Sequence, residues 1–415
     1  MNVFINFNEY LGGGETLLIR LFESISSEGG LVLTSKGSYI ASKLQPSRVY
    51  EFPGDYSFGY LNQDEKIDFY NWMDSVLADG SHKFVTFCLR DLWLLIGYYK
   101  FKGVNELKVM HLLLHPLDHL YLSQSLVDKL RVKLLSQEGY SLIKNRQHNS
   151  AMLKRLTKVN SLIPMNLNVL QRLNRDTGAN LDSSMIIPLP VIESDLNYRP
   201  IHESTKLFRI VWLGRIVDFK IPAILSMIDF VSNNAGYQYD IIGYGYEDVV
   251  NDYISFKNIP AGRVNLIGKV PHDQLDSQLS SYHVGYGMGT SVIEMVGRGL
   301  PTIVALAKPN FKQFKQPICA GFVHEQKYGN VGDDLYVNSE NDCPLIADTL
   351  TRAQKTPKEI YDLDFLSINK VFNLEDNISK YFEVMNSCDA VNVLDLKLPE
   401  VGFMKRVVNK WLVRK

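Results

Sequence analysis

Two cations follow directly after a short apolar run, in a place where they could bind a phosphate group. The run covers residues 208–213, and Arg215 and Lys220 come after it, behind Gly214. An arginine presents a planar fork of donors to phosphate oxygens, and a lysine presents a mobile point charge. Together they could hold a diphosphate leaving group and stabilise the charge that develops on it. Out of context, two solvated surface cations would be the simpler interpretation.

A glycine-rich turn in the same half of the chain has a similar chemical character. It spans residues 286–289 and contains Gly287 and Gly289, and a helical stretch with Thr290 and Ser291 in its first turn follows. Such a helix start is a good seat for an anion. Glu294, within that helix, could accept hydrogen bonds from the diol of a ribose. A surface glutamate without a ligand is the alternative.

The N-terminal half opens with a third turn of this type. An apolar run at residues 3–7 leads into Gly12, Gly13, Gly14 and Glu15, and a helical stretch follows. Glycines let the backbone approach a ligand, and the start of the helix attracts anions. The turn is neither a G-x-G-x-x-G dinucleotide fingerprint nor a Walker loop. An ordinary tight turn between a strand and a helix is the alternative.

Three histidines, His111, His115 and His119, recur every four residues and could place three imidazoles along one face of a helix. The run at 108–114 is more typical of a buried strand, however, and Pro116 follows it at once. We therefore do not expect a metal site there.

The elements that would position these residues alternate between short apolar runs and helix-like segments. This alternation predicts parallel sheets with helices on both faces. The expected strands lie at 3–7, 31–35, 83–89, 108–114 and 184–190 in the first half, and at 208–213, 239–245, 264–268, 283–289 and 300–306 in the second. A charged stretch without an apolar period, 191–206, is expected to link the two halves. Ligands of open parallel sheets bind at the carboxyl ends of the strands, where the glycine turns fall.

The composition is that of a globular protein and excludes several other classes. Of 415 residues, 46% are hydrophobic and 21% are charged, so a disordered chain, a collagen-like repeat and a coiled coil are excluded. The net charge of -1 argues against a nucleic-acid partner. The four cysteines are scattered and form no C-x-x-C pair, as is usual for reduced thiols. With neither a signal peptide nor a membrane-length apolar stretch, we expect a cytoplasmic protein or one held at a membrane surface.

The order of these motifs resembles that of the GT-B retaining glycosyltransferases, specifically family 4. The resemblance covers roughly residues 1–385. It rests on a G-G-x-E loop, a G-R-x-x-x-x-K turn, two G-x-G turns, and a glutamate followed by G-x-P. The first loop is matched by Gly13, Gly14 and Glu15 or by the adjacent register. The other matching residues are Gly214, Arg215, Lys220, Gly243, Gly245, Gly287, Gly289, Glu294, Gly299 and Pro301. The implied fold is α/β, with two Rossmann-like domains facing across a cleft and a C-terminal helix that can cross back to the first domain. We expect an acceptor-side domain at 1–195, a nucleotide-sugar domain at 196–385 and a basic tail at 386–415.

The resemblance also implies roles for individual residues. Arg215 and Lys220 would hold the pyrophosphate of the donor, and Glu294 would bind its ribose. Gly287 and Gly289 would place backbone amides near the sugar and the phosphates. From the first domain, the loop that contains Gly13 and Gly14 would close on the donor.

Two further positions concern the donor sugar. His115 would hydrogen-bond the sugar and could stabilise positive charge near its anomeric carbon; a structural histidine is the alternative. Tyr286 stands where the family has the first glutamate of a pair, which helps to hold sugar hydroxyls. Tyrosine brings a hydroxyl but no negative charge, so we expect either an unusual donor sugar or a loss of activity.

The implied reaction moves a sugar from a nucleotide-diphosphate donor to a glycan acceptor, with retention and without a metal or another cofactor. The Asp362-x-Asp364 triplet resembles the metal signature of the other large glycosyltransferase fold, but it lies too far along the chain to act as one. A lipid-linked acceptor of a bacterial surface polysaccharide, such as lipopolysaccharide, would suit the family. The alternatives are a degenerate GT-B protein that binds a glycan or a partner, and a nucleotide-sugar epimerase.

The final residues, 402–415, form a basic amphipathic pattern. Met404, Val407, Val408 and Trp411 recur at helical spacing, and five cations follow the last acid, Glu400. Such a helix suits an anionic membrane surface, for example the inner face of the cytoplasmic membrane. A helix that packs back onto the first domain is the alternative.

Overall fold

The chain divides into two compact units, each built around its own sheet. The first unit contains Met1–Pro190 and Glu375–Lys415, and the second contains Val191–Leu374. The structure, a computed structural model, describes residues 1–8, 12–25, 29–54, 63–77, 80–114, 140–190, 198, 207–306, 319–326, 330–332 and 343–396. These bounds differ from the expected domains. Residues 375–385 belong with the first unit and not with the second, and residues 386–396, expected in the tail, also belong with the first unit.

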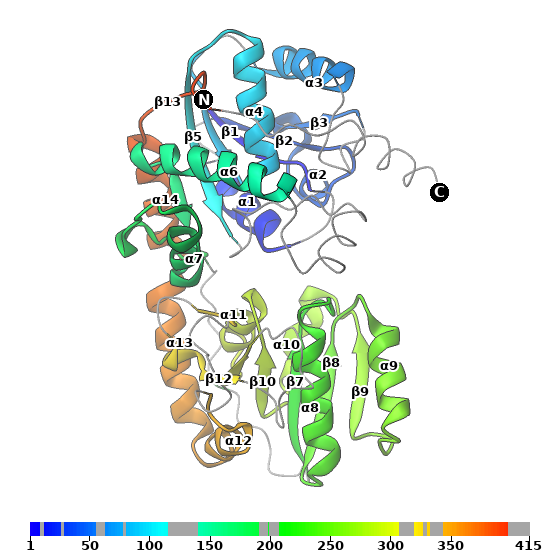
Figure 1. Cartoon of the computed structure of the whole chain (residues 1–415). Helices are drawn as coiled ribbons and strands as arrows, with labels where there is room; N and C mark the ends of the chain where they lie inside the picture. The colour runs from blue at the N-terminus through cyan, green and yellow to red at the C-terminus, as the bar shows by residue number, and fades with distance from the viewer. Residues whose placement is uncertain are drawn as a thin grey trace. The chain divides into compact units, whose positions relative to one another are not determined.

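The sheet of the first unit has seven strands in the order β13-β5-β4-β1-β2-β3, with β6 also beside β5 (Figure 1). All pairs are parallel except β13 with β5. The strands are β1 (Asn2–Asn6), β2 (Gly30–Ser35), β3 (Val49–Phe52), β4 (Lys83–Thr86), β5 (Glu106–Leu113), β6 (Leu162–Pro164) and β13 (Val391–Asn392). The chain runs from β1 outward to β3 and then returns to β4 on the other side of β1. The carboxyl ends of β1 and β4 therefore form a topological switch point.

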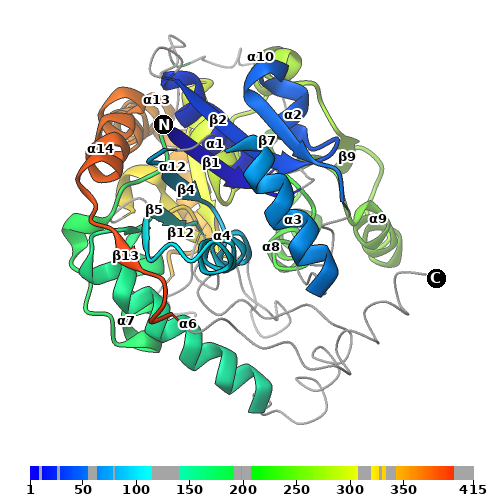
Figure 2. The ribbon, with the colours of Figure 1, turned by 90° about the horizontal axis from the view of Figure 1, so that it is seen from above.

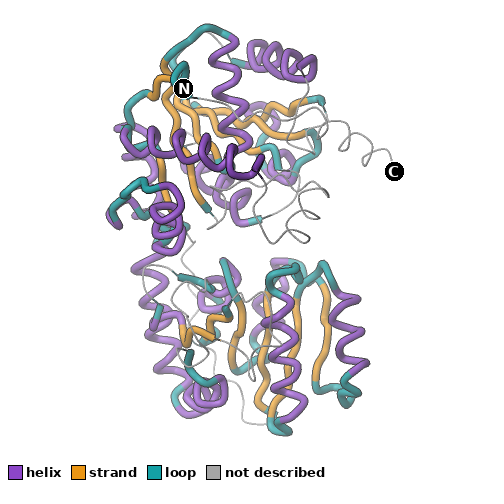
Figure 3. Tube along the Cα trace, in the orientation of Figure 1, coloured by secondary structure: helices purple, strands orange, loops and turns teal. Residues whose placement is uncertain are grey.

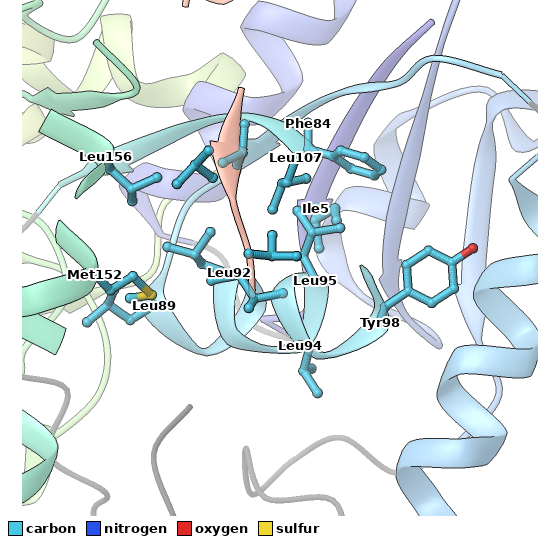
Figure 4. Close-up of a cluster of buried hydrophobic side chains, with 14 of the residues drawn as sticks. Ile5, Phe84, Leu89, Leu92, Leu94, Leu95, Tyr98, Leu107, Met152 and Leu156 are labelled. Atoms are coloured by element: carbon cyan, nitrogen blue, oxygen red, sulfur yellow. The ribbon is translucent and has the colours of Figure 1, made fainter. Parts of the chain in front are cut away.

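Helices cover the first sheet on both faces, and the alternation of side chains along β1 shows why. Val3 and Ile5 pack in the same cluster as Leu92 and Leu95, whereas the ring of Phe4 contacts Phe22 at 5.8 Å. Figure 4 shows the cluster that contains Ile5, Leu92 and Leu95. The helices are α1 (Gly13–Ser24), α2 (Tyr39–Lys43), α3 (Gln63–Val76), α4 (Leu89–Phe101), α6 (Tyr140–Lys158), α7 (Leu167–Thr177) and α14 (Leu374–Ser387).

The expected strand at 184–190 is absent. Residues Ser183–Met185 form a 3-10 turn, and Ile186 to Pro190 have no regular structure. Pro188 and Pro190 lack the N–H groups that a strand must donate. Further along the chain, two helices, α13 (Pro357–Phe372) and α14, are separated at Asn373.

The sheet of the second unit has six strands in the order β12-β11-β10-β7-β8-β9, and strands alternate with helices along the chain (Figure 3). Only β12 is antiparallel to its neighbour. The strands are β7 (Phe208–Leu213), β8 (Tyr237–Ile242), β9 (Val264–Gly268), β10 (Val284–Gly287), β11 (Thr302–Ala305) and β12 (Cys319–Phe322). The principal helices are α8 (Ile221–Asn233), α9 (Glu247–Phe256), α10 (Leu275–Leu279), α11 (Thr290–Gly297), α12 (Ile346–Lys355) and α13. The switch point of this sheet lies between β7 and β10, where the turns after both strands meet.

The end of the chain returns to the first unit, as the resemblance implied. The segment from α14 to β13 runs past β5 (Figure 2). The Tyr381 hydroxyl donates to the carbonyl of Ile187 at 2.9 Å, and Asp395 pairs with Arg155 at 2.7 Å. Residues 397–415, which include the basic amphipathic pattern, lie outside the described residues. Among the helices that the structure describes, none is long and apolar enough to cross a membrane.

Candidate functional site

At the switch point of the second unit, the turn after β7 meets the start of α11. Gly214 has a φ of +133°, and a Cβ atom on it would lie 3.2 Å from the Ser291 Oγ and 3.5 Å from the Lys220 Nζ. The Lys220 ammonium and the Ser291 hydroxyl both donate to the carbonyl of Met288, at 3.3 and 3.1 Å. A glycine is therefore needed at 214, both for its conformation and for the close approach of these groups.

Lys220 and Arg215 form a pair of cations at this edge. Burial, and then the neighbouring Arg215 guanidinium, lower the pKa of Lys220 to about 8. Arg215 is exposed. Within the described ranges, neither cation has a carboxylate within ion-pair distance. A partly buried lysine beside an arginine has an electrostatic cost, which a nearby carboxylate would offset. A bound anion would offset it in the same way.

The first amides of α11 face the same turn. Gly289 precedes this helix with a φ of +78° and donates its N–H to the carbonyl of Val331 at 2.6 Å. The amides of the first helical turn, which starts at Thr290, have no acceptor within the helix. Together with the helix dipole, they favour a negative charge. The Gly289 amide itself is bonded to Val331, so the expected role of this amide toward the phosphates stays a prediction.

Glycines in and just before the two G-x-G turns, at positions 243, 245, 285 and 287, serve close packing. A Cβ atom on Gly243 would lie 2.0 Å from the carbonyl oxygen of Gly214, and one on Gly245 would lie 2.2 Å from that of Ile216. Cβ atoms on Gly285 and Gly287 would meet Met295 of α11 at 2.8 and 3.0 Å. These glycines let the turn after β8 lie against the turn after β7, and let α11 lie against β10.

Tyr286 does not face a ligand, which corrects the expectation from the sequence. Its side chain is fully buried in the core, with its ring 5.9 Å from that of Trp212. Burial raises its pKa well above the ordinary value, and Ser226 of α8 provides a hydrogen bond. The reason is the alternation of β10: Val284 and Tyr286 point to one face, and Gly285 and Gly287 point to the other. Only Met288 and Gly289 connect β10 to α11, so residue 286 is part of a strand and not of a loop.

Glu294 lies on α11 and is 32% exposed. Its Oε1 atom is 3.2 Å from an Arg298 nitrogen and 3.0 Å from the His272 Nε2. Its second carboxylate oxygen has no hydrogen-bond donor among the described residues. One oxygen is therefore held by the protein, and the other can accept hydrogen bonds from a ligand.

In the first unit, Gly13 and Gly14 open helix α1, and Gly12 caps it in an extended conformation. A Cβ atom on Gly14 would lie 3.2 Å from the Leu114 Cδ1. Glu15 is buried, and its Oε1 atom accepts from the Asn6 and Asn8 side-chain amides at 3.1 and 2.9 Å. The glutamate of the G-G-x-E loop thus ties the start of α1 to the end of β1.

Sequence reasoning missed the other members of this polar network. Arg90 donates to the Asn8 Oδ1 at 3.1 Å and to the Asp91 Oδ1 at 3.2 Å. Asp91 is fully buried and accepts from the Phe7 amide at 3.4 Å. Burial raises the pKa of Asp91, and the Arg90 charge opposes this. Two features of the sequence could have indicated it: an N-x-N pair, Asn6 and Asn8, at the end of the first apolar run, and an R-D pair directly after the run at 83–89.

Of the three histidines, only His111 lies among the described residues. His111 is buried in β5, where its Nδ1 lies 2.9 Å from the Thr86 Oγ1, and burial lowers its pKa to about 3. His115 and His119 lie outside the described residues, so the expected role of His115 stays a prediction. The described residues contain no group of three His, Cys, Asp or Glu side chains that could hold a metal ion.

The D-x-D triplet is structural. Asp362 pairs with Lys358 at 2.5 Å. Asp364 is buried and accepts from the backbone amides of Thr302 and His324 at 3.2 and 2.9 Å. It holds α13 to the start of β11.

The structure is similar to solved GT-B glycosyltransferases over almost the whole chain. The lipopolysaccharide outer core galactosyltransferase WaaB, in its apo form, matches with a TM-score of 0.59 at 14% identity, over 93% of this chain and 99% of that chain. HepE of Anabaena, in complex with UDP-glucose, matches with a TM-score of 0.59 at 12% identity and the same coverage.

An enzyme of another class also matches. It is a putative UDP-N-acetylglucosamine 2-epimerase from Listeria monocytogenes, with a TM-score of 0.51 at 12% identity, over 97% of this chain and 99% of that chain. No family model and no curated protein sequence matches the chain. The chain has the GT-B fold: two Rossmann-like α/β units, with the C-terminal helix and strand returning to the first.

Proposed function

We propose that the protein is a retaining glycosyltransferase that moves a sugar from a nucleotide-diphosphate donor to a glycan acceptor. The observation that carries the proposal is the pair Arg215 and Lys220. These cations lie without a described carboxylate partner at the switch point of the second unit, beside the start of α11. A diphosphate is the chemical group that this arrangement fits best.

In this proposal the second unit binds the donor. The Arg215 fork and the Lys220 ammonium bind the diphosphate oxygens, and the α11 amides add partial positive charge. Glu294 accepts hydrogen bonds from the ribose. As the bond between the anomeric carbon and the β-phosphate oxygen breaks, these groups stabilise the negative charge of the leaving diphosphate. They can do so without a metal ion.

The first unit provides the acceptor side. The acceptor hydroxyl oxygen forms the new bond to the anomeric carbon on the face from which the diphosphate departs, and its proton passes to the departing phosphate. Among the residues that the structure describes, we identify no pair of carboxylates placed for a double displacement, and this favours attack on that face. We propose that His115 contacts the donor sugar and that Gly13 and Gly14 approach the donor.

The acceptor and the location are extensions of the same proposal. We propose a lipid-linked glycan of a bacterial surface polysaccharide as acceptor, and a cytoplasmic protein held at the inner face of the membrane by the tail at 402–415. The likeness to WaaB and the basic amphipathic pattern of the tail support this. Deleting 402–415 is expected to release the protein from anionic vesicles at moderate salt; unchanged co-sedimentation would contradict the membrane role.

Calorimetric titration with UDP, GDP, ADP, dTDP and CMP tests the proposal. Wild-type protein is expected to bind at least one of them below millimolar concentration. The double variant Arg215→Ala, Lys220→Ala is expected to lose at least about tenfold in affinity, since each charged hydrogen bond typically contributes ~1.5–3 kcal/mol. A second double variant, Lys355→Ala, Lys370→Ala, removes two exposed lysines of the same unit and serves as the matched control. Equal affinities in the two double variants would refute the assignment.

A second candidate function is a nucleotide-sugar epimerase, which the likeness to the Listeria protein favours. The two reactions differ in their products. Incubation with nucleotide sugar and no acceptor gives an epimeric nucleotide sugar in one case and at most free sugar and nucleotide in the other, and proton NMR distinguishes them. A degenerate protein would bind the ligand and give neither product.

A further inference from the structure

The Glu294 carboxylate belongs to a network of side chains from three neighbouring elements. Arg298 follows Glu294 by one helical turn, and each of its two terminal nitrogens contacts a different carboxylate. NH1 bonds the Asp276 Oδ1 at 2.5 Å, and NH2 lies 3.2 Å from the Glu294 Oε1. The His272 Nε2 lies 3.0 Å from both NH2 and the Glu294 Oε1. With its proton on Nε2, the imidazole donates to the carboxylate and accepts nothing from NH2. Asp276 belongs to α10, and His272 belongs to the 3-10 turn before it.

Burial sets this network apart from an ordinary surface ion pair. The Arg298 side chain is only 13% exposed, whereas the His272 side chain is 81% exposed. A buried planar fork that bridges two carboxylates has few alternative geometries. An exposed lysine or arginine in a single pair would hold its partner much more loosely.

These contacts fix the orientation of the Glu294 carboxylate. Its Oε1 atom receives both protein contacts, so rotation of the carboxylate would break two interactions at once. Its Oε2 atom has no donor among the described residues. The carboxylate is thus oriented before any ligand arrives, which lowers the entropic cost of binding one.

We propose that Arg298 and His272 are positioning residues that preset Glu294 for a vicinal diol, namely the 2′ and 3′ hydroxyls of a ribonucleotide. This rests on the proposed function and deepens it, because the network would select ribonucleotides over deoxyribonucleotides. Arg298 acts through Glu294 and does not touch the ligand. His272 closes the exposed side of the carboxylate.

The test compares ligands that differ only in these hydroxyls. The ribonucleoside diphosphate that binds best among UDP, GDP and ADP is titrated beside its 2′,3′-dideoxy form, and the ratio of the two dissociation constants is measured. Wild-type protein is expected to prefer the ribonucleotide roughly tenfold or more. Arg298→Ala and Arg298→Lys are expected to weaken the ribonucleotide alone and so to reduce the ratio at least about threefold. Lysine does not rescue, because one ammonium cannot bridge both carboxylates.

Controls separate positioning from a structural role. Arg352→Ala removes an arginine of the same unit that pairs with Glu325, and it is expected to leave the ratio unchanged. His272→Ala changes an exposed side chain, so it tests the proposal even if Arg298→Ala does not fold. In the background of Glu294→Gln, further substitution of Arg298 or His272 is expected to change the ratio little, because their effects pass through the carboxylate.

The possible outcomes test different parts of the proposal. A reduced ratio in the Arg298 and His272 variants, with Arg352→Ala unchanged, supports the proposal. A wild-type ratio in those variants overturns the positioning role and leaves the proposed function standing. A ratio near one in the wild type overturns the diol assignment. A wild-type protein that binds none of the three diphosphates overturns the proposed function and this inference together.

Discussion

At the residue scale, Lys220 carries a charge that its surroundings do not favour. Burial and the Arg215 charge lower its pKa from an ordinary value of 10.5 to about 8. In the unliganded protein the ammonium therefore loses its proton near pH 8, well below the range of an exposed lysine. A bound diphosphate would reverse this, since an anion favours the charged form.

Nucleoside diphosphate affinity is accordingly expected to fall as the pH rises from 7 to 9.5. Near pH 8 to 8.5, binding is expected to take up a fraction of a proton, because the complex holds Lys220 protonated and the free protein does not. Titration calorimetry in buffers of different ionisation enthalpy measures this uptake. Lys220→Met removes the titrating group, so its affinity should be lower and nearly independent of pH over this range. Proton release, or equal pH dependence in the variant, would contradict the assignment.

The same lysine affects stability in the opposite direction. A folded-state pKa below the unfolded value means that the unfolded chain binds more protons between pH 8 and 10.5, so this group's contribution to stability rises with pH there. As the pH rises above 8, Lys220 should therefore make the ligand-free protein more stable, while the affinity of the protein for a nucleoside diphosphate falls.

Tyr286 gives a second prediction at the residue scale. Since its hydroxyl lies in the core against Ser226, Tyr286→Phe is expected to cost ~1 kcal/mol of unfolding free energy and to leave donor binding unchanged. Tyr286→Glu, which restores the side chain of the family, would bury a carboxyl group and cost several kcal/mol. Denaturant unfolding and titration with nucleotide sugars measure both effects. A change in sugar discrimination without a change in stability would show that residue 286 does face the donor.

At the element scale, the turn after β8 is fitted to the turn after β7 without room for a side chain. Gly243→Ala would place a Cβ atom 2.0 Å from a backbone oxygen, which cannot move as the end of a side chain can. We expect a loss of more than ~3 kcal/mol of unfolding free energy, with loss of nucleotide binding, because the Arg215 turn would be displaced. Gly236→Ala is the matched control: its Cβ atom would meet nothing within 4 Å. Equal stabilities of the two variants by denaturant unfolding would refute this packing argument.

Much of the element pattern could be predicted from the sequence, because short apolar runs between amphipathic stretches are typical of parallel sheets. The position of the turn from Gly214 to Lys220 after a strand followed from that pattern, whereas the strand order, and with it the two switch points, did not. The direction of the Tyr286 side chain did not follow from the pattern: the resemblance turned it toward the donor sugar, whereas the alternation along β10 turns it into the core. The run at 184–190 misled for a related reason, since its apolar composition suits a strand but its prolines cannot pair.

The candidate site could be predicted only in part, because contacts between segments far apart in the chain are not visible in the local sequence pattern. Cations and glycines that follow one strand are adjacent in sequence, so their grouping at residues 214–220 was visible. The network around Glu294 joins α11 to the turn at His272–Gln274, and the network around Asn8 joins β1 to α4. Such contacts depend on which strand ends lie side by side, and a single sequence does not specify this.

At the scale of the whole molecule, the first unit depends on residues near the end of the chain. Tyr381, Met385, Val393 and Leu396 are buried within that unit. The Lys100 ammonium donates to the Leu396 carbonyl at 2.6 Å. Removing this segment would expose several fully buried side chains, each contributing about 1.5–3 kcal/mol.

Truncation after Phe372 is therefore expected to unfold the first unit while the second still binds nucleotide. Tryptophans allow the two to be followed separately, since Trp72 and Trp93 pack in the first core and Trp212 lies in the second. Single-tryptophan variants report the melting of each unit by fluorescence. Deleting only 402–415 serves as the comparison and is expected to leave both transitions in place. A truncated protein with an intact first transition would contradict this dependence.

The discontinuous first unit has a consequence for synthesis on the ribosome. The second unit is one unbroken stretch, 191–374, whereas the first needs residues that are translated after all of it. Strand β5 therefore cannot pair with β13 until the whole second unit has been translated. The nascent chain should reach its native state in inverted order, with the part made first finished last. The second unit can fold once residue 374 has left the ribosome, while the first still lacks β13.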